Sequence, residues 1–277
     1  MGLNHFPTIA LSNRKFTKGK SRMNNPLNFP LVVFVISFLA LWISSWIGVF
    51  LRGRMGKLDD LTRQDFSVVR AATLTLLGLI IGFSFSLAVS RYDQRKNDEE
   101  EEANAIGTEY LRADLLPAPY ATRAKSLLVS YLNQRILFYR SRNAHELQQI
   151  NSTTAQLQDE LWSAVRVPAT MQPTPLSTLS VTGMNDVLNS QGYTQAAWWN
   201  RIPVAAWCLM GAIAIWANLL LGYAARSVET HRLLASALPF IASIAFFLIA
   251  DIDSPRSGVI RVPPKNLIIL SQSLHPK

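Results

Sequence analysis

Residues 71–90 read AATLTLLGLIIGFSFSLAVS and contain no charged side chain. A helix needs about 20 apolar residues to cross the hydrocarbon core of a bilayer, which is roughly 30 Å thick. Three other runs reach about that length: residues 31–51, 202–225 and 233–250. A soluble chain of 277 residues could not cover four such helices on all sides. The sequence therefore predicts four transmembrane helices.

The overall composition agrees with a membrane protein and excludes several kinds of site. Hydrophobic residues make up 49% of the chain and charged residues 16%, against about 25% charged in a typical soluble domain. The single cysteine, Cys208, excludes an internal disulfide, a cysteine-rich zinc site and an iron–sulfur cluster. The four histidines are far apart in the sequence. We therefore predict no metal and no cofactor.

The charges predict an orientation and argue against nucleic-acid binding. The net charge is +9, but segment 91–201 is nearly neutral, with 11 basic and 12 acidic residues. The excess lies in the tails and beside the apolar runs, where orientation signals are found. The side with both termini and segment 91–201 has 13 basic residues near the membrane, against 7 on the other. We predict a multi-pass membrane protein with both termini cytoplasmic, whose partner is the lipid bilayer and not nucleic acid.

The first apolar run is interpreted as a retained anchor and not as a signal peptide. A secretory h-region has about 7–15 residues and ends at a small-residue cleavage site. Run 31–51 is longer and ends in the charged string LRGR. Residues 1–30 form a basic tail that we expect to be mobile. Whether Met1 or Met23 is the true start stays open.

The hydrophilic segment between the second and third runs reads as helical throughout. Its apolar residues recur at helical spacing, and prolines separate the stretches. The expected helices cover residues 91–116, 121–139, 143–165 and 176–199, with a turn at 168–175. The first and last of these continue spans two and three. The predicted fold is thus an all-α membrane protein with four transmembrane helices and a helical cytoplasmic layer between spans two and three, followed by a C-terminal tail, residues 251–277.

Span two carries the most structured pattern in the chain. Small residues recur at every fourth position: Gly78, Gly82, Ser86 and Ser90. Such faces let helix backbones approach closely in lipid, so ordinary helix packing is one interpretation. In the alternative interpretation span two lines a narrow pore, where Phe83 and Phe85 form an apolar constriction that gates by dewetting. The pattern fits both.

A run of charges follows span two, with Arg91 and Arg95 first and five consecutive acids at 98–102. Five adjacent carboxylates cannot all be buried without partners. We expect the first four to form a solvated helix face, and Glu102 to form an ion pair with Arg95 or Arg112. In an oligomer the same acids could ring a vestibule and favour cations, which counts against a simple anion channel.

Span four ends in a string whose Asp-x-Asp start resembles that of a calcium loop. The match stops there, because a proline and then Arg256 follow where the loop needs a ligand and a glycine, and no glutamate closes it. We expect Asp251 and Asp253 to cap the helix end and to pair with Arg256 or Arg261.

Motifs of catalysis are missing from the sequence. It contains no Gly-rich phosphate loop, GxSxG elbow, HExxH or CxxC motif. None of the four apolar runs contains Asp, Glu, Lys, Arg or His, which weakens proton-coupled transport and intramembrane hydrolysis. We predict that the chain is not an enzyme.

Three separated strings resemble a known family of bacterial membrane proteins. They read LGLIIGFSFSLAVSRYDQR (77–95), EANAIGTEYLR (102–112) and DIDSPRSGVIRV (251–262). The family is described as a bestrophin-like domain of unknown function, and the resemblance extends from about Asp65 to the C-terminus. Bestrophins are pentameric anion channels with four spans, cytosolic termini and a pore lined by the second span. The resemblance implies a similar arrangement here, in the inner membrane of a bacterium. The acidic calcium clasp that bestrophins have after span four has only a thin counterpart in this chain.

Two functions from different classes follow. The first is a homo-oligomeric passive ion channel for an inorganic anion such as chloride, with span two lining the axis. The second is a non-conducting membrane scaffold or signalling protein whose cytoplasmic helices, within residues 121–165, bind a partner.

Overall fold

A computed structural model describes residues 29–55, 60–224 and 228–274. Within these ranges every regular element is a helix and no strand occurs. The elements are α1 (Pro30–Met55), α2 (Asp60–Arg112), the 3₁₀ turn η2 (Ala113–Leu115), α3 (Ala118–Arg140), α4 (Ala144–Met171), α5 (Pro175–Trp199), α6 (Val204–Ala224), α7 (Val228–Asp253) and α8 (Lys265–Leu274). The all-α prediction is confirmed. The basic tail predicted to be mobile lies almost entirely outside the described residues.

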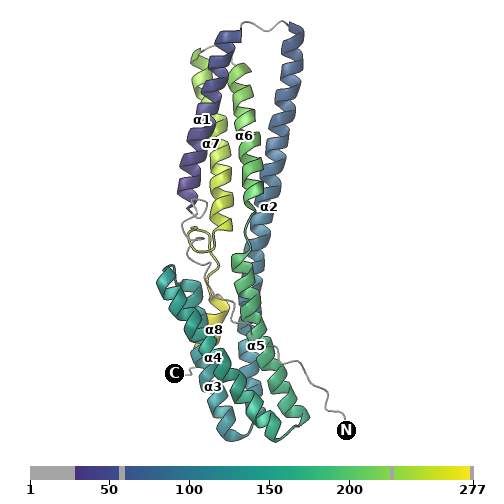
Figure 1. The fold of residues 1–277 in the computed structure, drawn as a ribbon, viewed down its shortest axis with the longest axis vertical. Helices are drawn as coiled ribbons and strands as arrows, with labels where there is room; N and C mark the ends of the chain where they lie inside the picture. The colour runs from purple at the N-terminus through teal and green to yellow at the C-terminus, as the bar shows by residue number, and fades with distance from the viewer. Residues whose placement is uncertain (1–28, 56–59, 225–227, 275–277) are drawn as a thin grey trace, which may run out of the picture.

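The helices form two tiers, one above the other in Figure 1. The membrane tier contains α1, α6, α7 and the first half of α2, and the lower tier contains the rest of α2 with α3, α4, α5 and α8. Four segments are long and apolar enough to cross a membrane: Pro30–Arg54, Thr62–Leu115, Pro175–Ala224 and Ser236–Asp253. Each overlaps one predicted run, so the prediction of four transmembrane helices is confirmed.

Two long helical columns connect the tiers. α2 is a single helix of 53 residues that runs through both. α5 and α6 form the second column, with a short break between them. The break begins at Asn200, whose N–H still donates to the Ala196 carbonyl at 3.0 Å. Pro203 precedes α6 and has no backbone N–H to continue the ladder.

In the membrane tier, α1 and α6 approach each other at two glycines. A Cβ on Gly48 would overlap the Leu219 carbonyl, and one on Gly222 would overlap the Ser45 carbonyl. The Ser44 hydroxyl also donates to the Ile215 carbonyl across this contact, at 2.6 Å. Small residues therefore allow backbone contact between spans one and three.

The lower tier has its own hydrophobic core between α2, α3, α4 and α5. Leu128, Leu161 and Met184 are fully buried in it. α4 continues to Met171, beyond the predicted end at 165 and into the predicted turn. Pro168 lies near the end of α4, where its missing N–H removes only one helical bond, and its ring is buried.

The C-terminal segment differs from its prediction as a tail, because residues Lys265–Leu274 form α8. Its first turn is held by Glu99 of α2. The carboxylate of Glu99 accepts from the Leu267 N–H at 3.1 Å and from the Asn266 side-chain amide at 2.8 Å. A remote acid thus caps the N-terminus of α8, where backbone donors lack partners and negative charge is favourable.

Candidate functional site

In span two, all six of the residues singled out from the sequence lie on the exposed side of α2: Gly78, Gly82, Phe83, Phe85, Ser86 and Ser90. The opposite side is buried and carries Leu77, Ser84 and Ala88. A Cβ added to Gly78 or to Gly82 would meet no described atom within 4 Å. The small-residue face therefore has no packing partner among the described helices of its own chain.

Below the membrane tier, the exposed side of α2 turns acidic. With about 100° between successive residues, Asp93, Glu100 and Glu101 fall on the side of the helix that carries Ser86. All three acids are exposed, and Lys96 lies at the edge of this side. We call these three acids, which continue the exposed side of span two, the acidic stripe.

Two of the acids expected on a solvated face are buried instead. Asp98 and Glu99 are 3% and 1% exposed. Asp98 accepts from the Gln94 side-chain amide at 2.8 Å, and Glu99 caps α8. Burial raises the pKa of both carboxyls. The prediction of a solvated face holds only for Glu100 and Glu101, because α8 covers the side of α2 that carries Glu99.

Glu102 forms a buried ion pair, but with neither predicted partner. It contacts Arg135 of α3 through two hydrogen bonds, one of them at 3.3 Å, and both side chains are fully buried. The hydroxyls of Thr194 (3.1 Å) and Tyr139 (3.4 Å) donate to the same carboxylate. Burial raises the pKa of Tyr139, so its hydroxyl stays a donor. The pair with Arg95 or Arg112 was a wrong prediction, since α3 and α5 supply the donors.

Glu109 is buried about two helical turns below Glu102 on α2. Unlike Glu102, it forms no buried ion pair within the part of the chain that the structure describes. Neither of its carboxyl oxygens has a hydrogen-bond partner among the described residues. A Cβ on Gly183 of α5 would overlap the carboxyl group and would also crowd Arg112. Arg112 itself lies 4.0 Å from Asp186. Burial raises the pKa of Glu109 to about 8, so the group is mostly protonated at neutral pH.

At the level where the tiers meet, charged groups join α2, α6 and α7. Arg95 donates to the carbonyls of Ile252 (2.7 Å) and Asp253 (3.5 Å) at the end of α7. The Asp253 carboxylate lies 3.5 Å from Arg91 and accepts from the Ile202 N–H at 3.1 Å. These contacts fix the lower ends of spans two, three and four relative to one another.

The loop after α7 is folded back over the helix end and tied to α3. The Asp251 carboxylate accepts from the N–H groups of Val259 and Ile260, at 2.7 and 2.8 Å. Arg256 donates to the carbonyls of Phe138 and Ser141, each at 2.9 Å. The expected ion pairs of the two aspartates with Arg256 or Arg261 are therefore not formed, because main-chain groups and Arg91 occupy the carboxylates.

Arg256 also lies over the rings of Phe138 and Trp198, at 4.6 and 4.3 Å. Arg135 approaches the same Phe138 ring at 4.4 Å. Cation–π contacts of this kind add to the two carbonyl bonds. The loop after span four is thus joined firmly to the lower tier.

Of the predicted charge network, the structure brings Arg91, Arg95 and Asp253 together. Glu102 and Arg112 do not contact these three residues, since Glu102 pairs with Arg135 and Arg112 lies near Asp186. Sequence reasoning missed Arg135 and Glu109. A signal existed for both. Glu109 lies seven residues after Glu102 and therefore on the same buried side of α2, and Arg135 continues the apolar spacing of Leu128 and Leu132. No group of three or more His, Cys, Asp or Glu side chains in the described part of the chain could hold a metal ion.

Comparison with known proteins gives one family and one fold. A family model described as a bestrophin-like domain matches residues 33–267, starting earlier than the resemblance seen from about Asp65. No curated protein matches the chain. Crystal structures of a bacterial bestrophin homologue from Klebsiella pneumoniae are similar in fold. One, solved by Zn-SAD phasing, has a TM-score of 0.63 at 14% identity, with 87% of this chain and 99% of that chain covered. Another, with a tryptophan-to-alanine mutation, has a TM-score of 0.64 at 14% identity over 88% and 96%.

Proposed function

The chain belongs to the bestrophin-like family, and from that premise we propose that it is a homo-oligomeric, passive ion channel that conducts inorganic anions, with α2 lining the pore. The observation that carries the proposal is the exposed side of α2 in the membrane tier. It consists largely of small and hydroxyl residues, and no described helix of the same chain covers it. A second copy or a pore is the natural neighbour of such a face.

Phe83 and Phe85 supply the constriction in this proposal. They are 62% and 41% exposed, on a helix whose other face is packed against its own chain. A ring of such side chains around an axis makes a narrow apolar neck, and narrow apolar necks control conduction through dewetting. A passive channel of this kind needs neither a catalytic reaction nor a bound cofactor.

The proposed orientation places both termini and the lower tier in the cytoplasm of a bacterial cell. It follows from the excess of basic residues on that side of the spans. The acidic stripe would then face the cytoplasmic vestibule and lower the local concentration of anions. Anion conduction would therefore depend on dehydration at the neck, against the field of these acids.

Liposome flux tests the proposal. We expect chloride flux from vesicles that carry the purified protein, and we expect Phe83→Ala and Phe85→Ala to change its rate or its selectivity. Phe50→Ala is the matched control, because Phe50 is equally exposed (60%) but lies on α1. Flux that is the same in all three variants would refute the neck. A protein without flux that captures a soluble partner through residues 121–165 would favour a scaffold.

A further inference from the structure

We infer that the boundary between the two tiers is a binding surface for the headgroups of anionic phospholipids. Its core is a set of arginines from four separate chain segments, which we call the basic collar: Arg91, Arg140, Arg142, Arg201 and Arg256. The inference concerns lipid binding and does not depend on ion conduction.

The turn between α3 and α4 lies against the lower end of span four. Arg256 follows the end of α7 by three residues and donates to the carbonyls of Phe138 and Ser141, both at 2.9 Å. In Figure 1 the joined ends of α3 and α4 point upward, toward the spans. Arg140 and Arg142 flank Ser141, and both side chains are exposed. Two exposed arginines therefore lie beside the point where span four leaves the membrane.

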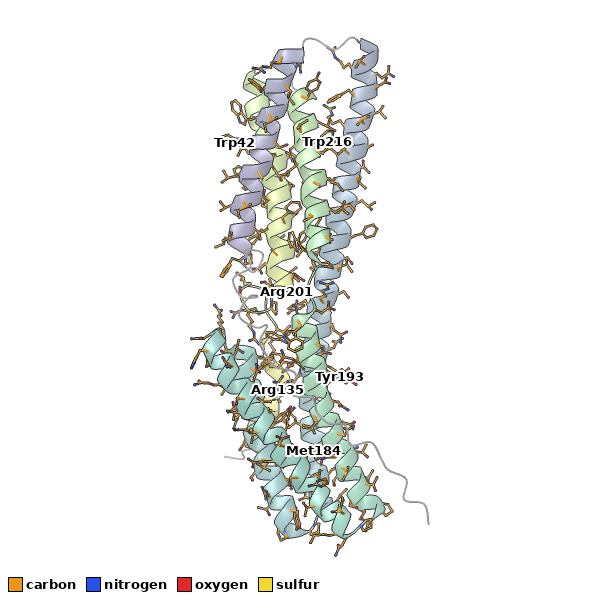
Figure 2. All side chains as sticks on the ribbon, viewed as in Figure 1. Trp42, Arg135, Met184, Tyr193, Arg201 and Trp216 are labelled. Atoms are coloured by element: carbon orange, nitrogen blue, oxygen red, sulfur yellow. The ribbon has the colours of Figure 1, made fainter. Side chains whose placement is uncertain are left out.

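Arg91 and Arg201 lie at the same level, Arg91 on α2 and Arg201 in the column of α5 and α6. Arg91 directly follows the uncharged stretch of α2, and Arg201 lies in the break between α5 and α6, where Figure 2 labels it. Asp253 contacts both Arg91 and the Ile202 N–H, which places these segments side by side. Trp199 is 53% exposed next to the break, and tryptophan is enriched at the membrane–water interface.

The nearby acids, Asp251, Asp253 and Glu146, offset only part of the positive charge of the five collar arginines. Asp253 is engaged by Arg91 and a backbone N–H, and Asp251 by two backbone N–H groups. Glu146, at the start of α4, accepts from the Ser141 hydroxyl at 2.6 Å. Burial and the charges of Arg135 and Arg201 lower the pKa of Arg256 to about 10, which still leaves it cationic at neutral pH.

A lipid headgroup fits this surface better than a soluble anion does. The exposed Arg140 and Arg142 and the partly buried Arg91, Arg201 and Arg256 lie along the level where the spans end. They do not converge on one enclosed site, so they match a layer of phosphates. Basic residues beside transmembrane helices attract anionic headgroups, and each charge near the surface strengthens binding by about fivefold. Arginine also presents a planar fork that suits phosphate oxygens.

The test compares two double variants of the full chain that remove the same charge. Arg140→Gln with Arg142→Gln removes exposed collar residues, and Arg123→Gln with Arg166→Gln removes exposed arginines elsewhere on α3 and α4. The purified proteins are equilibrated with mixed micelles of phosphatidylglycerol and phosphatidylcholine, and the retained phosphatidylglycerol is counted per protein.

We expect the collar variant to require at least tenfold more phosphatidylglycerol for half-saturation, and the control variant to match the wild-type chain. Equal retention in all three proteins would overturn the inference. If millimolar inorganic phosphate displaced phosphatidylglycerol from the wild-type chain, the surface would bind free phosphate, and the assignment to lipid would be wrong.

Discussion

Single residues strongly affect the stability of the lower tier, and the buried ion pair of Glu102 and Arg135 is the clearest case. Both side chains are fully buried, and the carboxylate has four donors from two other helices. Removal of one partner leaves an uncompensated charge in the core, which costs about 3–5 kcal/mol.

We therefore expect Arg135→Met to lower the thermal midpoint of the detergent-solubilised protein strongly. The double variant Glu102→Gln with Arg135→Met should recover part of the loss, because no unpaired charge then remains. Differential scanning fluorimetry measures both. An Arg135→Met protein that is as stable as the wild type, or a double variant that is less stable than Arg135→Met alone, would argue against the pair.

Glu109 predicts a dependence of stability on pH. Its pKa is about 8 in the folded protein, against 4.5 ordinarily, so the folded protein keeps a proton that the unfolded chain releases between these values. Stability should therefore fall as the pH rises through this window. Glu109→Gln cannot ionise and should flatten the profile, with a gain of a few degrees at pH 8–9, the order expected for about 1 kcal/mol.

The matched control for this measurement is Asp159→Asn, which changes an exposed acid of α4. Thermal midpoints are recorded from pH 5 to pH 9 for the three proteins. A Glu109→Gln profile as steep as that of the wild type would show that another group is responsible.

The helices could be predicted from apolar runs and proline positions, but their exact ends and their packing partners could not. The four spans were predictable because uncharged stretches of this length have few other uses. α8 was missed because its first turn is stabilised by Glu99, more than 160 residues away in the chain. An ion pair of Glu102 was predicted, but its partner Arg135 was missed for the same reason, since only the fold brings α3 beside α2.

The helix contacts predict opposite outcomes for glycines that look alike in the sequence. Gly222→Ala should reduce the yield of folded protein, because the new methyl group would meet the Ser45 carbonyl on α1. Gly78→Ala should leave the folded protomer unaffected, because nothing described lies within 4 Å. Size-exclusion chromatography after solubilisation measures the folded fraction. Equal losses in both variants would contradict the α1–α6 contact.

At the scale of the whole molecule, the single chain leaves apolar surface uncovered even outside the spans. In the lower tier Leu111, Met171, Tyr193 and Ile269 are each more than 60% exposed. Contiguous exposed apolar patches mark contacts with another protein, whereas single exposed apolar residues are normal. Leu111 lies on the side of α2 that carries Ser86, at about 100° per residue. Its exposure continues the uncovered face of span two and favours a homo-oligomer in which copies meet along α2.

Cysteine modification tests whether the exposed side of α2 faces water inside the membrane. Ser86→Cys is introduced with Cys208→Ala, which removes the only native thiol, and anion flux is measured before and after a charged, membrane-impermeant thiol reagent. Ile43→Cys, at an exposed position on α1, serves as the control. We expect the reagent to block flux through the Ser86→Cys protein and to leave flux through the control unchanged. If the reagent cannot modify Ser86→Cys and flux through this protein persists, the exposed side of α2 does not line a water-filled pore.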